Sequence, residues 1–562
     1  MTFTRHSIFS KKYVLFIFLW LLLFALYFPA AKAGFVADFT GWLEQLRFHT
    51  FREHINRTNF HGRSLYQFTQ FNTWFFYKLL GVSEWGWHLL FLTIHVFNAM
   101  LLYNLISGIM QDSGIKDNRE IAFAGVVLFS VSPYISETIV WESSFHFLQG
   151  LLLILLILNH VRKFITTNKR KYALYAGIVY CLSTFSLEVF YITPWLVLML
   201  ALYYRYVVTD GQKLLKQTLL LFFLPELLLF MLHLILFRLI YGSWVAHIAT
   251  DVVTTTPIDG MGKPIKYLFH LLFLGRFFSE ETKQIVYQVC DSIKCIIIFY
   301  SLLAVLCIIM MVRFRKMANK WKLFCLLFFW MLTALAIITP LWFGNMLLVI
   351  YDRYTYFADA FFYMLVTLLI SFITIKFLKI SLFIICVAIN MRFTIKANRY
   401  WGKSARIIYS LLHKVPTNES RTIILLNIPQ CMRGIPMIGA EKNSEFKLMH
   451  DLLIPDNTIK PTLYDAMAYN MITPDDGVHT RVLNDSTVRV VLNQWGTWWW
   501  FESKGGYDYE NMDYKIHLND GGNTGLCYEI TLKKPSGNYL LLFQSGENWK
   551  TVDMNNLQFD QY

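Results

Sequence analysis

Charged residues are scarce in this sequence. Asp, Glu, Lys and Arg make up 16% of the 562 residues, whereas hydrophobic residues make up 56%. Because soluble domains contain about 25% charged residues, the composition excludes an ordinary soluble globular protein. The sequence also has no internal repeat, and it lacks the paired broken helices that mark the related halves of many transporters. A secondary transporter or lipid flippase is therefore an alternative interpretation and not the leading one.

The eight cysteines form no evident disulfide framework. Four of them lie inside apolar runs, where a cysteine is usually a small core residue. Cys290 lies near Cys295 at the start of one such run, and Cys431 and Cys527 lie in the C-terminal part. Either pair is able to form a disulfide outside the cell, and the spacing alone does not decide whether it does.

Long apolar runs dominate the first 392 residues. The first run, 13–31, carries no charge and approaches the roughly 20 residues that span a bilayer. It is longer than the apolar part of a secretory signal, so we predict a retained anchor. Further runs follow at 87–110, 121–136, 145–161, 172–187, 189–207, 217–242, 292–312, 323–350, 354–375 and 378–391. The sequence therefore predicts about eleven transmembrane helices.

Basic residues gather in alternate gaps between these runs. If the helices simply alternate in direction, the clusters at 11–12, 116–119, 162–171, 213–216, 313–322 and 376–379 all fall on one side of the membrane. This is the pattern of cytoplasmic loops, so the net charge of +14 does not indicate a nucleic-acid partner. The distribution of the basic residues predicts a cytoplasmic N-terminus. The segments predicted to be extracytoplasmic are 34–86, 135–145, 243–289 and 343–353.

The C-terminal part has a different sequence pattern. After about residue 415, short β-branched runs such as 422–426 and 487–492 alternate with turn signals such as 519–522. Segment 393–414 mixes aromatic, aliphatic and basic residues, as amphipathic interfacial helices do. We therefore predict an α-helical polytopic membrane protein. Its parts are a transmembrane domain (1–392), an interfacial linker (393–414) and a C-terminal β-rich domain (415–562).

Acidic residues at the outer membrane surface are the candidates for chemistry. Asp38 follows the first apolar run, Glu137 lies in segment 135–145, and Glu188 lies near the outer end of its run. Ionisable groups at membrane depth are costly and usually mark substrate or ion paths. An acidic group held at the lipid surface, as Asp38 would be, suits an enzyme that acts on a lipid-linked substrate.

Glu226 lies deeper, inside the run 217–242. We predict that it pairs with Arg238 or His233, because an unpaired carboxylate inside a membrane is costly. Carboxylates at this depth, which also include Asp359, are the observation that supports the transport alternative.

Four motifs, in order along the chain, resemble the membrane part of the tetratricopeptide-bearing protein O-mannosyltransferases. They are Gly62-Arg63-Ser64-Leu65 with the Phe71-Asn72, Gly86-Trp87-His88-Leu89 and His95-Val96-Phe97-Asn98 segments; Ser132-Pro133-Tyr134-Ile135-Ser136-Glu137 with Trp141; Ser186-Leu187-Glu188; and Asp352-Arg353-Tyr354-Thr355-Tyr356. By this resemblance residues 1–375 belong to the GT-C class of glycosyltransferases. The chain differs in having no tetratricopeptide repeats and a single Asp38 where many relatives have paired acidic residues.

The resemblance implies inverting transfer of a sugar from a polyprenyl-phosphate donor to a hydroxyl of an extracytoplasmic protein, glycolipid or glycan. A hydroxyl acceptor needs a base, and Asp38 is the candidate. The lipid phosphate needs a cation, and Arg353 and Tyr354 are the residues predicted to bind the phosphate. Substrate binding is predicted for Glu137, Glu188, His61, Arg63 and Tyr356. No metal ligand is assigned, and a divalent metal stays an open alternative.

The segment Arg421–Pro429 resembles the "Leu-Asn-x-Pro" strand that opens the periplasmic domain of bacterial relatives, which favours an extracytoplasmic C-terminal domain. The cluster Trp495, Trp498, Trp499, Trp500 and Phe501 suits either sugar stacking or contact with the bilayer. No ER-retention signal follows Asp560, so we expect the bacterial inner membrane with the site facing the periplasm. A polysaccharide polymerase or ligase is the nearest enzymatic alternative.

Overall fold

The structure is a computed structural model that divides into two compact units. It describes all residues except 1–11, 37, 57–64, 187, 209–210, 243, 245–256, 338, 340–351, 416–420, 439–448, 451–461, 493–496, 500–507, 520–526, 535–536 and 555–562. The helical unit comprises Met1–Phe28 and His49–Ala397. The β-rich unit comprises Pro29–Phe48 and Asn398–Tyr562. The expected class, a polytopic helical protein with a β-rich C-terminal region, is confirmed.

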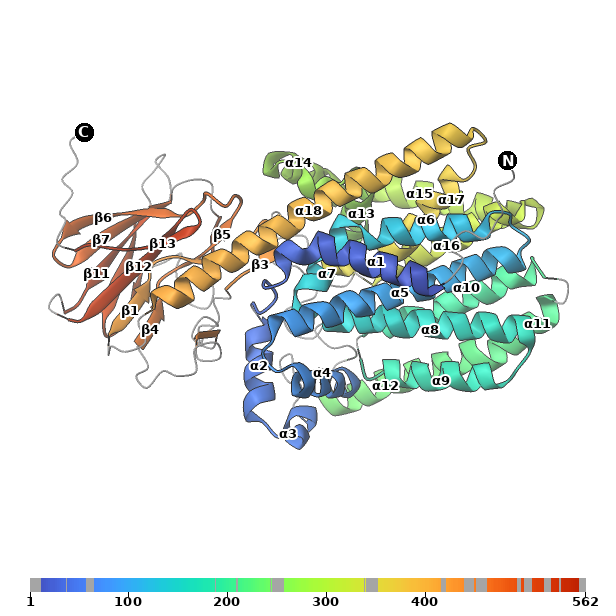
Figure 1. The fold of residues 1–562 in the computed structure, drawn as a ribbon, viewed down its shortest axis with the longest axis horizontal. Coiled ribbons are helices and arrows are strands. Elements are labelled where there is room, and N and C mark those ends of the chain that lie inside the picture. The colour runs from blue at the N-terminus through green and yellow to red at the C-terminus, as the bar shows by residue number, and fades with distance from the viewer. Residues whose placement is uncertain are drawn as a thin grey trace. The chain divides into compact units, whose positions relative to one another are not determined.

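The helical unit is built from long, closely packed helices (Figure 1). They are α1 (Lys12–Tyr27), α3 (Phe51–Asn56), α4 (Gln67–Leu80), α5 (Glu84–Asp112), α6 (Asn118–Ser130), α7 (Ser136–Val140), α8 (Phe145–Thr167), α9 (Lys171–Ser183), α10 (Thr193–Arg205), α11 (Gly211–Thr218), α12 (Leu224–Tyr241), α13 (Pro257–Phe273), α14 (Glu280–Asp291), α15 (Ile293–Arg313), α16 (Asn319–Ala336), α17 (Tyr356–Ile370) and the first part of α18 (Lys376–Lys414). In the core of this unit α5 packs against α6 and α8, and α17 packs against α6 and α16.

Among the described residues, seven helical segments are long and apolar enough to cross a membrane, or eight if the bent pair α6 and α7 is one span. Each predicted run contains a helix, although several runs also include described residues in turns or irregular structure, such as 131–132, 184–186 and 371–375. However, α9, α10 and α17 have 13, 13 and 15 residues, which is short of the ~20 that span a bilayer. The runs 189–207 and 354–375 begin with 3₁₀ turns instead of α-helix. The chain is an integral, multi-pass membrane protein.

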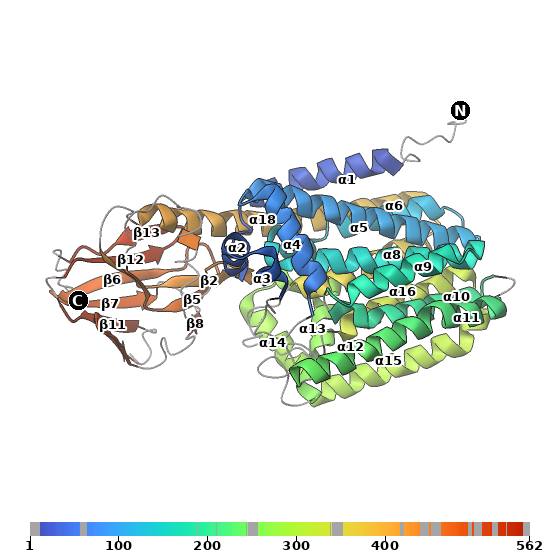
Figure 2. The same cartoon turned by 90° about the horizontal axis from the view of Figure 1, so that it is seen from below.

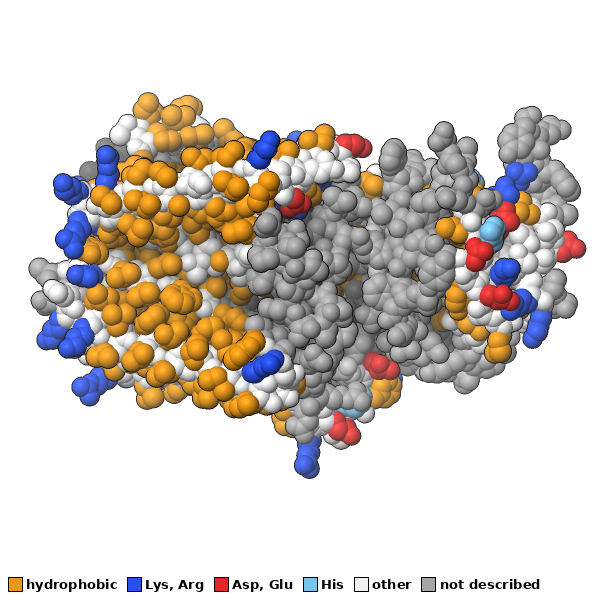
Figure 3. Space-filling view, turned by 180° about the vertical axis from the view of Figure 1, so that it is seen from behind, with side chains coloured by type: hydrophobic (Ala, Val, Ile, Leu, Met, Phe, Trp, Pro, Cys, Tyr) orange, Lys and Arg blue, Asp and Glu red, His pale blue; other side chains and the backbone are white. Residues whose placement is uncertain are grey.

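The surface of the helical unit agrees with a membrane location. Seen from behind, it presents a broad apolar face, with Lys and Arg side chains gathered along the end at the left edge of Figure 3. An apolar band that ends in basic residues is what positive-inside membrane proteins show. Which side of the membrane this end faces stays a prediction.

The described strands of the β-rich unit, labelled in Figure 2, form three sheets. Their strands are β1 (Thr422–Leu425), β2 (Ile428–Met432), β3 (Ile435–Pro436), β4 (Thr462–Asp465), β5 (Ala468–Met471), β6 (Val478–Asn484), β7 (Thr487–Leu492), β8 (Thr497–Trp499), β9 (Tyr509–Glu510), β10 (Tyr514–Asn519), β11 (Cys527–Leu532), β12 (Tyr539–Ser545) and β13 (Asn548–Thr551). The sheet orders are β13-β12-β1-β4, β6-β7-β11-β10-β9 and β3-β2-β5-β8.

Strand β1 confirms the strand predicted to open this domain. It pairs in parallel with both β12 and β4, and its last three residues are buried, as expected for a central strand covered on both faces. The following Asn427 donates to the carbonyl of Gln544 at 3.0 Å and accepts from the Gln544 N–H at 2.8 Å. This side chain therefore ties the end of β1 to β12.

The second half of α18 belongs to the β-rich unit. Trp549 of β13 donates its indole N–H to the carbonyl of Ile407 at 3.0 Å, and Lys403 pairs with Glu547 at 2.6 Å. The segment predicted as an interfacial linker, 393–414, is thus continuous with α18. Helix α2 (Asp38–Phe48) and the residues before it also belong to this unit.

Candidate functional site

Two adjacent residues of opposite charge form the centre of the candidate site. They lie in the 3₁₀ turn η9 (Asp352–Thr355), just before α17. Arg353 donates its backbone N–H to Glu137 Oε2 at 3.1 Å, and its guanidinium Nη1 donates to Glu137 Oε1. Asp352 forms an ion pair with Arg276. Consecutive residues therefore hold two ion pairs side by side.

The two cations of these pairs are more accessible than the two acids. The side chains of Arg276 and Arg353 are 13% and 14% exposed, whereas those of Asp352 and Glu137 are 2% and 4% exposed. Each carboxylate thus lies behind its guanidinium. A ligand that reaches this site meets positive charge first, and an arginine fork is suited to an anionic oxygen group.

The local sequence explains why Glu137 faces η9. Ser132 accepts the N–H of Tyr134 at 3.3 Å as an N-cap, and Pro133 starts a new 3₁₀ turn, η3 (Pro133–Ile135). Because proline removes a backbone donor, it interrupts a continuing helix. The chain bends by 49° between α6 and the segment Pro133–Val140, and α7 then packs against η9.

Aromatic rings surround the Arg353 guanidinium. Its central carbon lies 4.7 Å from the Trp141 ring centroid and 4.9 Å from the Tyr354 ring centroid. Tyr354 in turn meets Phe147 edge to face, with centroids 5.5 Å apart. Cation–π contacts of this kind orient an arginine, so Arg353 is held in place by both its carboxylate and its aromatic neighbours.

Helix α13 contributes a second wall to the site. Tyr267 is fully buried. Burial raises the pKa of its hydroxyl well above the ordinary value, the nearby Tyr354 and Glu137 add to this rise, and Arg353 opposes it. His270 is also buried, and burial, together with the positive charges of Lys283 and Arg276, lowers its pKa to about 3. The His270 imidazole is therefore neutral at physiological pH.

Lysines add positive charge to α13 and α14. Lys263, Lys266 and Lys283 are 3%, 4% and 6% exposed, respectively. Lys266 pairs with Asp291 at 2.5 Å and lies 5.5 Å from the Tyr287 ring. The same two helices also carry four acidic residues, Asp259, Glu280, Glu281 and Asp291, so their net charge does not by itself favour an anionic ligand.

The other predicted site residues are placed as follows. Asp38 begins α2 in the β-rich unit, and Glu188 begins the 3₁₀ turn η5 (Glu188–Ile192) in the helical unit; the side chains of both lie outside the described part of the structure. His61 and Arg63 lie outside the described residues. Of the predicted set, the structure thus brings together Glu137, Arg353 and Tyr354.

Tyr356 is directed into the helix core. Its hydroxyl accepts from the Asn98 amide at 3.0 Å and is hydrogen-bonded to His95 Nδ1 at 2.8 Å. The residue is fully buried, as is His95. Its contacts connect α17 with α5 and, through the ring of Phe129 at a centroid distance of 5.7 Å, with α6. The role of Tyr356 in substrate binding stays a prediction.

Arg276 is the residue that sequence reasoning missed. It lies in the 3₁₀ turn η7 (Gly275–Phe277), within the segment predicted to be extracytoplasmic. Positive-inside bias makes basic residues less expected in such a segment, so its presence there was an available signal. Its ion pair with Asp352 has no sequence signal, because the two residues are far apart in the chain.

The predicted pairing of Glu226 is wrong. Arg238 donates instead to the carbonyl of Gly242, and the His233 ring lies 4.9 Å from the ring of Phe190. Glu226 is buried, and neither carboxylate oxygen has a hydrogen-bond partner among the described residues. Arg238 lies twelve residues after Glu226 on the same helix, about 18 Å along the axis at 1.5 Å per residue, so the two side chains do not meet.

The described residues contain no group of three or more His, Cys, Asp or Glu side chains arranged to hold a metal ion. All eight cysteines are free in the structure, so neither of the two pairs that the sequence left open, Cys290 with Cys295 and Cys431 with Cys527, is joined as a disulfide. The side chains of the tryptophan cluster at 495–500 lie outside the described residues.

No family model and no curated protein matches the sequence. Similar solved structures include the crystal structure of ArnT from Cupriavidus metallidurans in the apo state, with 11% identity and a TM-score of 0.41 over 84% of this chain and 94% of that chain. Another is ArnT from the same organism bound to undecaprenyl phosphate, with 12% identity and a TM-score of 0.41 over 81% and 92% of the two chains. A similarity of this size does not assign the chain to a family.

Proposed function

We propose that this protein is a GT-C-type membrane glycosyltransferase that moves a sugar from a polyprenyl-phosphate donor to a hydroxyl of an extracytoplasmic acceptor. The observation that carries the proposal is the pair of partly exposed arginines, Arg276 and Arg353, held by Asp352 and Glu137. The motif resemblance of segments 132–141 and 352–356 supports it, because these two segments form the Glu137–Arg353 contact.

The leaving group explains why arginines are needed. Breaking the bond between the anomeric carbon and the phosphate oxygen leaves its electron pair on a lipid phosphate. A guanidinium stabilises that developing charge with two parallel hydrogen bonds. In the proposal Arg353 binds this phosphate in exchange for part of its contact with Glu137, and Arg276 supplies the second positive charge.

The acceptor side requires a base. The acceptor oxygen attacks the anomeric carbon as its proton passes to a carboxylate, and a single displacement inverts the anomeric centre. We assign this role to Asp38 on the motif resemblance and on its place at the start of α2. Glu137 and Glu188 are proposed to bind sugar hydroxyls, and His61 and Arg63 to line the acceptor path. Tyr354 and Tyr356 are proposed as the aromatic residues on the donor side.

A polymerase or ligase would use the same donor and differ only in its acceptor, so the geometry supports it equally. Secondary transport is favoured by one specific observation, the buried carboxylate of Glu226, which has no hydrogen-bond partner in the part of the chain that the structure describes. Intramembrane carboxylates of this kind often carry ions or protons. An assay of sugar transfer by the wild-type chain separates transport from sugar transfer.

The test measures sugar transfer from radiolabelled polyprenyl-phosphate sugars in membranes that contain the full chain. Asp38→Asn and Arg353→Gln are compared with Glu44→Gln, which changes a partly exposed carboxylate on the same helix as Asp38. We expect both site variants to lose transfer and the control to retain it. Transfer by Asp38→Asn at the wild-type rate would exclude Asp38 as the base. Absence of transfer by the wild type across a panel of donor sugars would instead favour transport.

A further inference from the structure

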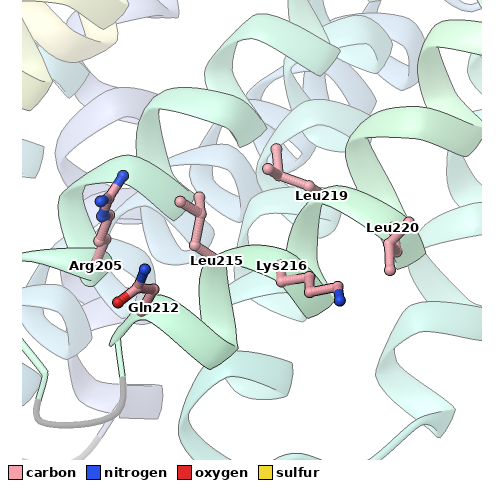
Figure 4. Close-up of a pocket in the computed structure, with 6 residues that line it drawn as sticks. All are labelled: Arg205, Gln212, Leu215, Lys216, Leu219 and Leu220. Carbon is pink, nitrogen blue, oxygen red and sulfur yellow. The ribbon is translucent and has the colours of Figure 1, made fainter.

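A pocket of about 390 Å³ lies in the helical unit where α10 ends and α11 begins (Figure 4). It is lined by Arg205, Gln212, Leu215, Lys216, Leu219 and Leu220. Helices α7 and α11 lie at opposite ends of this unit (Figure 1), so the pocket is separate from the ion pairs at Glu137 and Arg353. Its lining combines two cations and an amide with three leucines.

The local backbone explains the shape of this pocket. Helix α10 ends at Arg205, and after a short connection α11 (Gly211–Thr218) starts. Helix α11 leads directly into a π-helical turn, η6 (Leu219–Phe223). A π-turn widens a helix locally, and such turns occur frequently at functional sites. Leu219 and Leu220, which begin this turn, line the pocket, whereas Phe222 of the same turn is buried against Phe164 with centroids 5.1 Å apart.

The cationic part of the pocket is held in position. The Arg205 guanidinium lies 5.3 Å from the Tyr206 ring centroid, and Arg315 lies 5.5 Å from the centroid of the same ring. Lys322 donates to the Tyr206 carbonyl at 3.2 Å. Among the described residues, neither Arg205 nor Lys216 forms an ion pair; Asp210, just before α11, lies outside them. The pocket therefore offers positive charge to a ligand.

The apolar part of the pocket faces the bilayer. Only 17% of the apolar window in the span Gln212–Tyr241 is buried inside the protein, and Leu220 is 53% exposed. Polar residues precede Leu219 and a membrane-length apolar stretch follows it. This is the depth at which lipid headgroups meet acyl chains.

We propose that this pocket binds one anionic phospholipid of the leaflet that faces the basic end of the helical unit. Arg205 and Lys216 bind its phosphate, Gln212 donates to a headgroup oxygen, and an acyl chain packs on Leu215, Leu219 and Leu220. A free phosphate ester would use the cations alone and leave the three leucines without a partner. The lipid is the occupant that matches both halves of the lining. This proposal does not depend on the sugar-transfer activity.

The test uses native mass spectrometry of the full chain in detergent. The protein is titrated with phosphatidylglycerol and with phosphatidylcholine of identical acyl chains. We expect phosphatidylglycerol to bind about 25-fold more tightly, because each of the two basic residues near an anionic headgroup contributes roughly fivefold. We expect Arg205→Gln/Lys216→Gln to abolish this preference. Lys213→Gln is the matched control, because Lys213 is an exposed lysine of α11 that does not line the pocket.

Three outcomes would overturn the proposal. One is equal binding of the two lipids by the wild type. Another is a phosphatidylglycerol preference that survives in Arg205→Gln/Lys216→Gln or that is lost equally in Lys213→Gln. The last is displacement of the lipid by glycerol 3-phosphate at equal concentration, which would identify a site for a soluble phosphate ester. A second variant, Leu219→Ser/Leu220→Ser, checks the apolar half, and we expect it to weaken lipid binding while thermal unfolding shows that the chain is folded.

Discussion

Glu137 and Arg353 are 216 residues apart in the chain, yet both carboxylate oxygens of Glu137 accept hydrogen bonds from Arg353, one from its backbone N–H and one from its guanidinium. A side chain that binds the backbone and the side chain of one residue fixes both its position and its orientation. The contact ties segment 132–141 to η9. A phosphate ligand that binds the Arg353 guanidinium would have to replace part of this contact with Glu137.

Arg353→Lys tests whether the guanidinium geometry matters beyond its charge. Lysine keeps the positive charge but loses the planar fork and much of the stacking on Trp141 and Tyr354. We expect the turnover number for sugar transfer to fall by about 100-fold, as when one preorganised donor to a developing anion is removed. Arg489→Lys, which alters an ion pair in the β-rich unit, is the control. Equal turnover of Arg353→Lys and wild type would contradict a role in leaving-group stabilisation.

Glu137→Gln should destabilise the helical unit more than an average substitution. It leaves the Arg353 guanidinium without its carboxylate, and breaking a buried ion pair costs about 3–5 kcal/mol. Thermal unfolding in detergent measures the effect. The double variant Glu137→Gln/Arg353→Gln should regain part of the lost stability because no unpaired charge remains, yet it should not regain sugar transfer. A double variant less stable than Glu137→Gln alone would be evidence against the ion pair.

Gly402→Ala tests how the segment before Asp38 is held within the β-rich unit. A Cβ at Gly402 would lie 2.5 Å from the carbonyl oxygen of Pro29, so α18 and this segment would have to move apart. Overpacking of this kind costs about 1–3 kcal/mol. The matched control is Gly177→Ala in α9, where a Cβ meets nothing within 4 Å and should stabilise by about 0.5–1 kcal/mol. Unfolding midpoints that move in the same direction for both variants would contradict this packing.

The lowered pKa of His270 makes the stability of the folded protein depend on pH. Its folded-state pKa, about 3, lies below the ordinary 6.5 because burial disfavours the charged ring, and nearby cations add to this. The unfolded chain therefore binds the proton more readily. The contribution of His270 to the free energy of unfolding is fully present above about pH 6.5. It is lost as the pH falls toward 3, by up to about 1.4 kcal/mol per pH unit.

The measurement is the unfolding free energy of the full chain in detergent between pH 5 and pH 8. His270→Gln removes the titrating ring, so the dependence on pH below 6.5 should become flatter. His413→Gln, at an exposed position near the end of α18, should leave the dependence unchanged. A slope that is the same in wild type and His270→Gln would show that other groups cause it.

The sequence by itself determined the class of this protein and the places of its long apolar helices. Apolar runs of membrane length become helices because a single segment satisfies its own backbone hydrogen bonds within a bilayer only as a helix. The β-branched run at 422–425 forms a strand as predicted, whereas Ser132 and Pro133 break the helix inside the run 121–136, which was predicted as one span. Each of these outcomes depends on residues close together in the chain.

Only the tertiary structure decided which charges meet. Glu226 was expected to pair with a cation on its own helix, but it is buried without a hydrogen-bond partner among the described residues. Arg276 was not singled out at all, although it pairs with Asp352. Likewise, α2 belongs to the β-rich unit and not to the helices that surround it in the sequence. Pairings of this kind depend on the sum of many weak contacts between distant segments, and neither periodicity nor composition records that sum.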